Sequence, residues 1–302
     1  MKETISARVI KSTGSWYHVM DKDLNITECR LRGKFRVKGL KTTNPVAVGD
    51  IIDFDPQTNS IINIQKRKNY IIRKATNLSK QSHIIASNMD QAIIIVSLAL
   101  PRTSTGFIDR FLITAEAYHI PAVIVFNKID LLDEKSNASL QDIINTYTNI
   151  GYQCLQTSVK ESINLDKFAS LLDNKISLLA GHSGVGKSAL INTVDPNFSL
   201  REGEISDYHS KGMHTTTFAE MFRLESGAYI IDTPGIKEFG LIGFEQEELG
   251  QRFPEFRLHM DDCKYNNCLH INEPGCAINK AVKDGQISKK RYHNYINILS
   301  SI

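Results

Sequence analysis

An eight-residue phosphate-loop motif, GHSGVGKS, runs from Gly181 to Ser188 and constrains the fold more than any other stretch. The motif G-x-x-x-x-G-K-[S/T] requires a buried strand before it and a helix after it, because backbone N–H groups and the helix N-terminus together surround a phosphate. Apolar KISLLA precedes the motif and helix-compatible SALINTV follows it. A doubly wound α/β domain with a nucleotide site is therefore expected. The alternative is a glycine-rich turn without a ligand.

Each position of the loop has an expected role. The backbone N–H groups from Gly184 to Lys187 face the phosphates, Lys187 neutralises the β- and γ-phosphates, and the Ser188 hydroxyl binds Mg²⁺. The nucleotide-binding positions expected here are Gly181, His182, Ser183, Gly184, Val185, Gly186, Lys187 and Ser188.

The stretch NKID places Asn127, Lys128 and Asp130 directly after the apolar run PAVIVF. A carboxylate at Asp130 can accept hydrogen bonds from N1–H and the exocyclic amine of guanine, a pair that adenine does not offer. The motif therefore predicts selection of GTP over ATP. An Asn-Lys turn before a helix would explain the same letters. Further on, QTSVK resembles the small-residue loop in which the backbone of Ser158 would contact the guanine oxygen.

A D-x-x-G motif, DTPG, ends the apolar run AYIIDTPG at Asp232 to Gly235. We expect Asp232 to hold Mg²⁺, through water, and the Gly235 amide to meet the γ-phosphate. A mobile switch should lie between the phosphate loop and DTPG, and one of three adjacent threonines there should complete the metal shell. Of Thr215, Thr216 and Thr217, we favour Thr216.

The motifs stand in an unusual order, because NKID precedes the phosphate loop. Ordinary GTP-binding proteins have the reverse order. Joining the old ends of a domain and opening it elsewhere leaves every loop at the same sheet edge. The order therefore indicates a circularly permuted GTPase whose site is intact. In this arrangement DTPG leads directly into the C-terminal region, so that the γ-phosphate state can be relayed there.

Three of the five cysteines cluster near the C-terminus with a histidine. Cys263, Cys268, His270 and Cys276 form C-x4-C-x-H-x5-C, which is a Cys3His set suited to tetrahedral Zn²⁺. Four protein ligands leave no position for water, so such a zinc would be structural. The competing interpretation is free thiols and a surface histidine.

Composition and charge bound the function classes. The chain has 302 residues, of which 41% are apolar, and a net charge of +3, which is ordinary for a globular protein. The charge is segregated: residues 1–74 hold 15 Lys/Arg against 7 Asp/Glu, and residues 263–302 hold 6 against 2. Basic ends around an acidic middle suggest a polyanion partner, although solvated lysines explain them equally. We expect a cytoplasmic protein, because no signal peptide or membrane span is present.

Three domains are expected along the chain. Residues 1–70 have about five short β-rich stretches and predict a small antiparallel barrel, with an oligonucleotide-binding (OB) barrel as the leading candidate. There Trp16, Tyr17 and Phe35 either form core or offer ring faces for bases. Residues 71–245 alternate apolar runs with helical stretches and form the GTPase domain, and residues 246–302 form a small helical zinc domain.

These features together resemble one family, the ribosome small-subunit-dependent GTPase A (RsgA/YjeQ) proteins. The resemblance covers essentially the whole chain: a basic OB barrel, NKID before GHSGVGKS, GMHTTT, DTPGIKEFG and CKYNNCLHINEPGC. It implies a cytoplasmic GTPase that binds the small (30S) ribosomal subunit and its rRNA late in assembly, is stimulated there, and leaves after hydrolysis. It also implies the same four zinc ligands, one zinc per chain, and Mg²⁺ with GTP or GDP. His182 and Ala189 depart from the usual residues at non-essential positions.

Catalysis requires a group that orients water. Ile236 stands where other GTPases often have glutamine, so we expect slow hydrolysis by the isolated chain. His214, directly before the three threonines, is the candidate substitute, and the family motif G-x-H-T-T-T implies the same residue. Alternatively, His214 simply packs or faces solvent. Two other functions stay open: a GTPase of large-subunit assembly, and a non-catalytic RNA-binding module with a structural nucleotide site. We expect a monomer without membrane contact.

Overall fold

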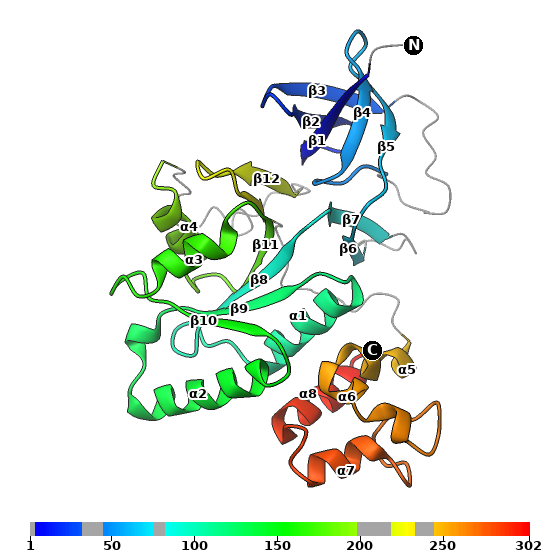
Figure 1. Ribbon diagram of the computed structural model, residues 1–302, viewed down its shortest axis with the longest axis vertical. Helices are drawn as coiled ribbons and strands as arrows, with labels where there is room; N and C mark the ends of the chain where they lie inside the picture. The colour runs from blue at the N-terminus through cyan, green and yellow to red at the C-terminus, as the bar shows by residue number, and fades with distance from the viewer. Residues whose placement is uncertain (1–3, 32–44, 75–81, 198–218, 233–244) are drawn as a thin grey trace, which may run out of the picture.

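The computed structural model describes residues 4–31, 45–74, 82–197, 219–232 and 245–302 (Figure 1). Its strands are β1 (Ile5–Ser12), β2 (Trp16–Asp21), β3 (Ile26–Leu31), β4 (Ile51–Asp55), β5 (Ser60–Ile64), β6 (Tyr70–Lys74), β7 (Ser82–Ser87), β8 (Gln91–Val96), β9 (Ala122–Phe126), β10 (Gln153–Gln156), β11 (Ile176–Ala180), β12 (Glu220–Arg223) and β13 (Tyr229–Asp232). Its helices are α1 (Thr105–Ala117), α2 (Glu134–Thr148), α3 (Leu165–Leu172), α4 (Lys187–Val194), α5 (Gln246–Leu249), α6 (Pro254–Arg257), α7 (Ala277–Lys283) and α8 (Lys289–Leu299).

The N-terminal strands β1 to β5 close into the predicted barrel, in which the pairings are antiparallel except that β3 and β5 pair in parallel. β1 pairs with both β2 and β4, and the circuit is completed through β3 and β5. Side chains alternate between the inside and the outside of each strand, so Tyr17 is 1% exposed in the core whereas Trp16 is 42% exposed. Of the three aromatic residues considered for stacking, only Trp16 is seen to present its ring to solvent, since Phe35 lies outside the described residues.

A second set of strands forms the predicted doubly wound sheet in the order β10-β9-β8-β11-β13-β12. All neighbours are parallel except β12 and β13. Both faces are covered, which is why the strands are apolar throughout: in β8, Ile93 and Ile95 pack on one face, and Ile94 and Val96 on the other.

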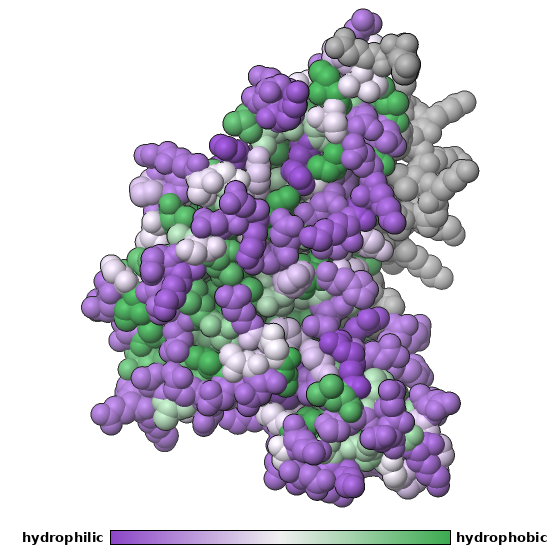
Figure 2. All heavy atoms as spheres, in the orientation of Figure 1, coloured by the Kyte–Doolittle hydropathy of each residue, from purple (hydrophilic) through white to green (hydrophobic). Residues whose placement is uncertain are grey.

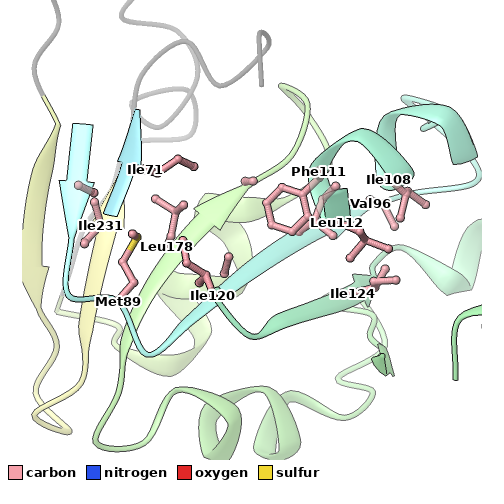
Figure 3. Packing of buried hydrophobic residues seen from close by; sticks show 14 of the residues in the cluster. Ile71, Met89, Val96, Ile108, Phe111, Leu112, Ile120, Ile124, Leu178 and Ile231 are labelled. Carbon is pink, nitrogen blue, oxygen red and sulfur yellow. The ribbon is translucent and has the colours of Figure 1, made fainter. Parts of the chain in front are cut away.

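Helices α1 and α2 cover one face of this sheet, and α3 and α4 cover the other (Figure 1). On the first face, Phe111 and Leu112 of α1 pack near Val96 of β8 and Ile124 of β9 (Figure 3). Helix α1 begins at the N-cap Ser104, whose side chain accepts a hydrogen bond from the Phe107 N–H. Helix α2 begins in the same way at Asp133. The α/β class predicted from the alternating runs is confirmed.

The barrel is joined to the sheet by more contacts than the sequence suggested. The basic stretch that follows β5 leads into β6, which pairs with β7 in an antiparallel hairpin. Val48 of the barrel makes a bridge with Ala86 of β7 and belongs to the core of the α/β domain. Strand β1 also pairs with β12, through Lys11 and Glu220. The barrel and the GTPase sheet are thus continuous.

The C-terminal residues form short helices around a separate apolar core that includes Phe253, Phe256 and Tyr295. This core packs against α1, and Ile113 of α1 is part of it. Hydrophilic side chains cover most of the molecular face drawn in Figure 2. Among the described residues, no helix is long and apolar enough to cross a bilayer.

Candidate functional site

Four of the predicted site segments meet at the carboxyl edge of the sheet. The phosphate loop follows β11, NKID follows β9, and the Ser158 segment follows β10. Asp232 is the last residue of β13 and lies opposite Leu179 of β11 in the parallel register. Parallel strands bring these ends together whatever their order in the chain, so the permutation leaves the site assembled.

Two glycines of the phosphate loop are favoured by close contacts and by a positive φ. Gly181 has φ +142°, and a Cβ there would lie 2.2 Å from the carbonyl oxygen of Ile95 on β8. Gly186 has φ +97°, and a Cβ there would lie 2.3 Å from the side-chain amide of Asn127. A Cβ at Gly181 would push the loop away from β8, and a Cβ at Gly186 would displace the Asn127 amide. Both positive φ values also favour glycine.

Lys187 and Ser188 begin α4, and both are buried at the base of the loop. The Lys187 ammonium donates to the carbonyl oxygens of Gly181 and His182, at 2.8 and 2.9 Å. These bonds hold the positive charge against the loop, next to the backbone N–H groups at the start of α4. Such an arrangement suits phosphate oxygens.

The NKID residues contact the phosphate loop directly. The Asn127 side-chain amide donates to the Val185 carbonyl at 2.8 Å, and its oxygen accepts from the Thr157 hydroxyl at 3.0 Å. Lys128 has a left-handed backbone conformation, and its ammonium donates to the Gly184 carbonyl at 2.6 Å. The two motifs therefore form one connected structure.

Asp130 lies in a single 3-10 turn, Ile129–Leu131, and contacts the segment after β10. The Ser158 hydroxyl donates to Asp130 Oδ1 at 2.5 Å and accepts from the Glu161 N–H at 3.1 Å. This pairing orients the carboxylate while its second oxygen keeps acceptor capacity. The side chain of Ser158 thus has a partner that the sequence-based prediction, which used only its backbone, did not include.

The metal-side residues are only partly described. Ser188 is buried at the start of α4, and Asp232 pairs with Glu220 of β12 in the antiparallel register. A hydroxyl and a carboxylate at one sheet edge fit the oxygen ligands that Mg²⁺ prefers. The other predicted positions, Thr216, Gly235 and the catalytic candidate His214, lie outside the described residues.

The predicted zinc ligands come together in the C-terminal domain. The Sγ atoms of Cys263, Cys268 and Cys276 and a ring nitrogen of His270 all lie within 4.8 Å of one another. His270 Nδ1 is 3.6 Å from the sulfur of Cys263 and 3.5 Å from that of Cys276. His270 is 3% exposed, which contradicts the alternative of a surface histidine. The donor set and its closeness fit tetrahedral zinc.

A second layer of contacts orients these ligands. The Ala277 N–H donates to the Cys263 sulfur and the Asn279 N–H to the Cys276 sulfur, each at 3.4 Å. The Tyr292 hydroxyl donates to the His270 carbonyl at 2.8 Å. Burial lowers the pKa of His270, which favours the neutral imidazole that binds metals.

Comparison with known proteins identifies the family. The model of the RsgA GTPase matches residues 64–242, and the model of the RsgA N-terminal domain matches residues 7–62. A Bacteroides thetaiotaomicron protein named small ribosomal subunit biogenesis GTPase RsgA 2 is 52% identical, over 96% of this chain and 95% of its own length. The Flavobacterium johnsoniae protein named small ribosomal subunit biogenesis GTPase RsgA is 50% identical, over 98% and 93%.

Two solved structures share the whole architecture. YjeQ from Thermotoga maritima is 32% identical, with a TM-score of 0.80 over 99% of this chain and 98% of its own. YloQ, described as a circularly permuted GTPase, is 30% identical, with a TM-score of 0.76 over 99% and 95%. The barrel and the permuted GTPase fold expected from the sequence are therefore confirmed.

Proposed function

The chain belongs to the RsgA GTPase family, and on that premise we propose that it hydrolyses GTP on the small ribosomal subunit late in the maturation of that particle. The observation that carries the proposal is the identity of about half of all residues, over nearly the whole chain, with relatives named for small-subunit biogenesis. The intact contacts between NKID and the phosphate loop support the GTPase activity itself.

Nucleotide binding uses the residues at the sheet edge. Backbone N–H groups of the phosphate loop and the α4 N-terminus receive the phosphates, and Lys187 exchanges its carbonyl partners for β- and γ-phosphate oxygens. Ser188, Thr216 and Asp232 would hold Mg²⁺, which neutralises charge on the phosphates when bound. Asp130 accepts the two guanine N–H groups, Asn127 and Lys128 support the base and the loop, and the Ser158 backbone contacts the guanine oxygen.

Hydrolysis converts GTP and water to GDP and phosphate. The residue that follows DTPG is Ile236, which has no hydrogen-bonding side chain, so the chain alone lacks a glutamine to orient water. We assign that role to His214, and the contact of the γ-phosphate to the Gly235 amide. Stimulation then depends on the ribosomal subunit, which orients the histidine and the attacking water toward the γ-phosphate.

The basic ends of the chain are the proposed contacts with rRNA. Residues 1–74 carry 15 Lys/Arg, and the five lysines of residues 263–302 are all exposed. The sixth basic residue of the tail, Arg291, is buried and therefore contributes to folding instead. Phosphate neutralisation by the exposed groups releases counterions, so binding should weaken steeply with salt. The exposed ring of Trp16 on the barrel offers a face on which an RNA base can stack.

We keep three domains, residues 1–70, 71–245 and 246–302, and a monomeric cytoplasmic protein without membrane contact. The Cys3His cluster would hold one structural zinc, with Cys263, Cys268, His270 and Cys276 as its ligands. A GTPase of large-subunit assembly is disfavoured because relatives at about 50% identity are named for the small subunit. A non-catalytic RNA-binding module would bind GTP without releasing phosphate.

Co-sedimentation with purified ribosomal subunits tests the proposal. The chain is mixed with small or large subunits in the presence of a non-hydrolysable GTP analogue, GDP or no nucleotide. We expect strong sedimentation with small subunits and the GTP analogue, weaker sedimentation with GDP, and little with large subunits. Preferential binding to large subunits, or binding that ignores the nucleotide, would contradict the proposed function.

A further inference from the structure

The phosphate loop is contacted from the side by an aromatic residue of α1. The rings of Phe107 and His182 stack with centroids 4.0 Å apart and an interplanar angle of 29°. The carbonyl oxygen of the same His182 accepts a hydrogen bond from the Lys187 ammonium at 2.9 Å. The Phe107 ring therefore positions the residue that holds the phosphate-binding lysine.

Phe107 itself is held at a defined place in the first turn of α1. Its N–H donates to the side chain of the N-cap Ser104 at 3.2 Å, and its ring packs against the apolar core between the sheet and helices α1 and α2. Because stacking is sensitive to ring position, a small shift or rotation of this turn would change the contact with His182.

Helix α8 of the C-terminal domain contacts the same turn of α1. The Asn294 side-chain amide donates to the Thr105 hydroxyl at 3.1 Å and to Asp109 Oδ2 at 2.6 Å. Thr105 and Asp109 stand two positions before and after Phe107. One residue of α8 thus binds both sides of the turn that carries the stacking ring.

A buried ionic network fixes α8 against α1. Arg291 of α8, 2% exposed, donates to Asp109 at 2.5 Å and makes two bonds, at 2.8 and 3.0 Å, with Glu255 of α6. The Tyr147 hydroxyl from α2 donates to Asp109 at 2.7 Å. Removing one member of such a network leaves a buried charge without a partner, so the helices are held in one arrangement.

These contacts form a continuous path, and we propose that the C-terminal domain controls the phosphate loop through α1, with Phe107 as the positioning residue. The inference rests on the proposed function, because it concerns the regulation of the GTP site. A partner that binds the C-terminal domain and displaces α8 would thereby change the affinity for the nucleotide. This path consists of described residues and is independent of the segment between the phosphate loop and DTPG.

A double-mutant cycle between Asn294 and Phe107 tests the path in the full-length protein. The readout is the equilibrium affinity for fluorescent GDP and for a fluorescent non-hydrolysable GTP analogue, without ribosomes. Asn294→Ala and Phe107→Leu should each weaken binding of the analogue at least about threefold, in the range of couplings between neighbouring residues. In the Phe107→Leu background, Asn294→Ala should add less than about a twofold change, because the path is already broken.

Two controls separate positioning from general destabilisation. Phe107→Tyr preserves a stacking ring and should restore affinity to within about twofold. Arg257→Ala removes a contact between the C-terminal domain and Glu116, at the far end of α1, and should leave nucleotide affinity unchanged. Circular dichroism and thermal unfolding establish that each variant is folded.

The outcomes are distinguishable. Additive effects of the two substitutions, or no effect of Asn294→Ala on affinity in a folded variant, would overturn the inference while leaving the proposed function intact. A wild-type protein that fails to bind guanine nucleotides would overturn both.

Discussion

The side-chain amide of Asn127 donates a hydrogen bond to the carbonyl of Val185, 2.8 Å away, although 58 positions separate the two residues. The bond joins the NKID segment to the phosphate loop. It is possible in this order of motifs because β9 and β11 flank β8 in a parallel sheet, so that their carboxyl ends lie together. Position in the sheet, not order along the chain, builds the site.

Guanine selection should depend on Asp130. Asp130→Asn replaces a carboxylate by an amide, and if its oxygen keeps the bond from Ser158, its NH2 group faces the guanine N–H groups. We expect a loss of GTP affinity of about 2 kcal/mol or more, or roughly 30-fold, by titration with fluorescent GTP. Asp133→Asn is the matched control. It also replaces one carboxylate by an amide, but at the N-cap of α2, where asparagine caps a helix as well as aspartate does. Unchanged affinity in the Asp130 variant, or equal binding of ATP by the wild type, would refute the assignment.

Stability should depend on Asp50, which joins the barrel to the hairpin β6–β7. Its buried carboxylate accepts two bonds from Arg67, both at 2.6 Å, and one from the Ser87 hydroxyl at 2.6 Å. Asp50→Ala removes the carboxylate that neutralises the Arg67 guanidinium, which keeps a bond to the Pro45 carbonyl at 2.7 Å, and should lower the free energy of unfolding by about 3 kcal/mol in urea titrations.

Asp53→Ala provides the comparison for that measurement. Asp53 lies in β4, three positions after Asp50, and in the described part of the chain its carboxylate accepts bonds from the exposed amides of Asn63 and Gln65. Its loss should therefore cost less than about 1 kcal/mol. Equal losses in the two variants would show that the buried network does not join the two parts.

Zinc should be needed for the C-terminal fold. We expect about one zinc per chain by elemental analysis, and chelation should increase amide hydrogen exchange after about residue 250. Cys276→Ser should reduce the zinc content, whereas Cys154→Ser should not, because Cys154 lies outside the cluster. A zinc content below about a tenth of an equivalent per chain, in protein purified without chelator, would contradict the prediction of a structural zinc.

Ribosome-stimulated turnover should depend on His214. His214→Ala is expected to keep GTP affinity and to lose about 10- to 1000-fold of the stimulated rate, which is the usual contribution of positioning and acid–base groups. The measurement is phosphate release at saturating small subunits. A rate within about twofold of the wild type would assign the orientation of water to the ribosome itself.

The sequence predicted the class of fold because its signals are local. The uniformly apolar strands, the glycine spacing of the phosphate loop and the Cys3His pattern each report a backbone or metal geometry that few arrangements satisfy. For this reason the barrel, the permuted α/β domain and the clustering of Cys263, Cys268, His270 and Cys276 could all be anticipated.

Contacts between distant segments could not be anticipated. The hydroxyl of Ser158 bonded to Asp130, the ring of Phe107 stacked on His182, and Arg291 buried between Asp109 and Glu255 depend on how separate elements pack. Charge counting assigned Arg291 to a basic surface, although its partners lie 182 and 36 positions away. A single sequence carries no periodic signal for such pairs.

The most direct test of the proposed function is the rate of phosphate release from GTP by the chain alone, with small subunits, and with large subunits. The family assignment and the absence of a glutamine after DTPG predict a slow intrinsic rate, strong stimulation by small subunits and none by large ones. The stimulated rate should fall as salt rises, because the proposed binding surface consists of basic groups that contact rRNA phosphates. A rate that small subunits leave unchanged, or that large subunits raise equally, would contradict the account.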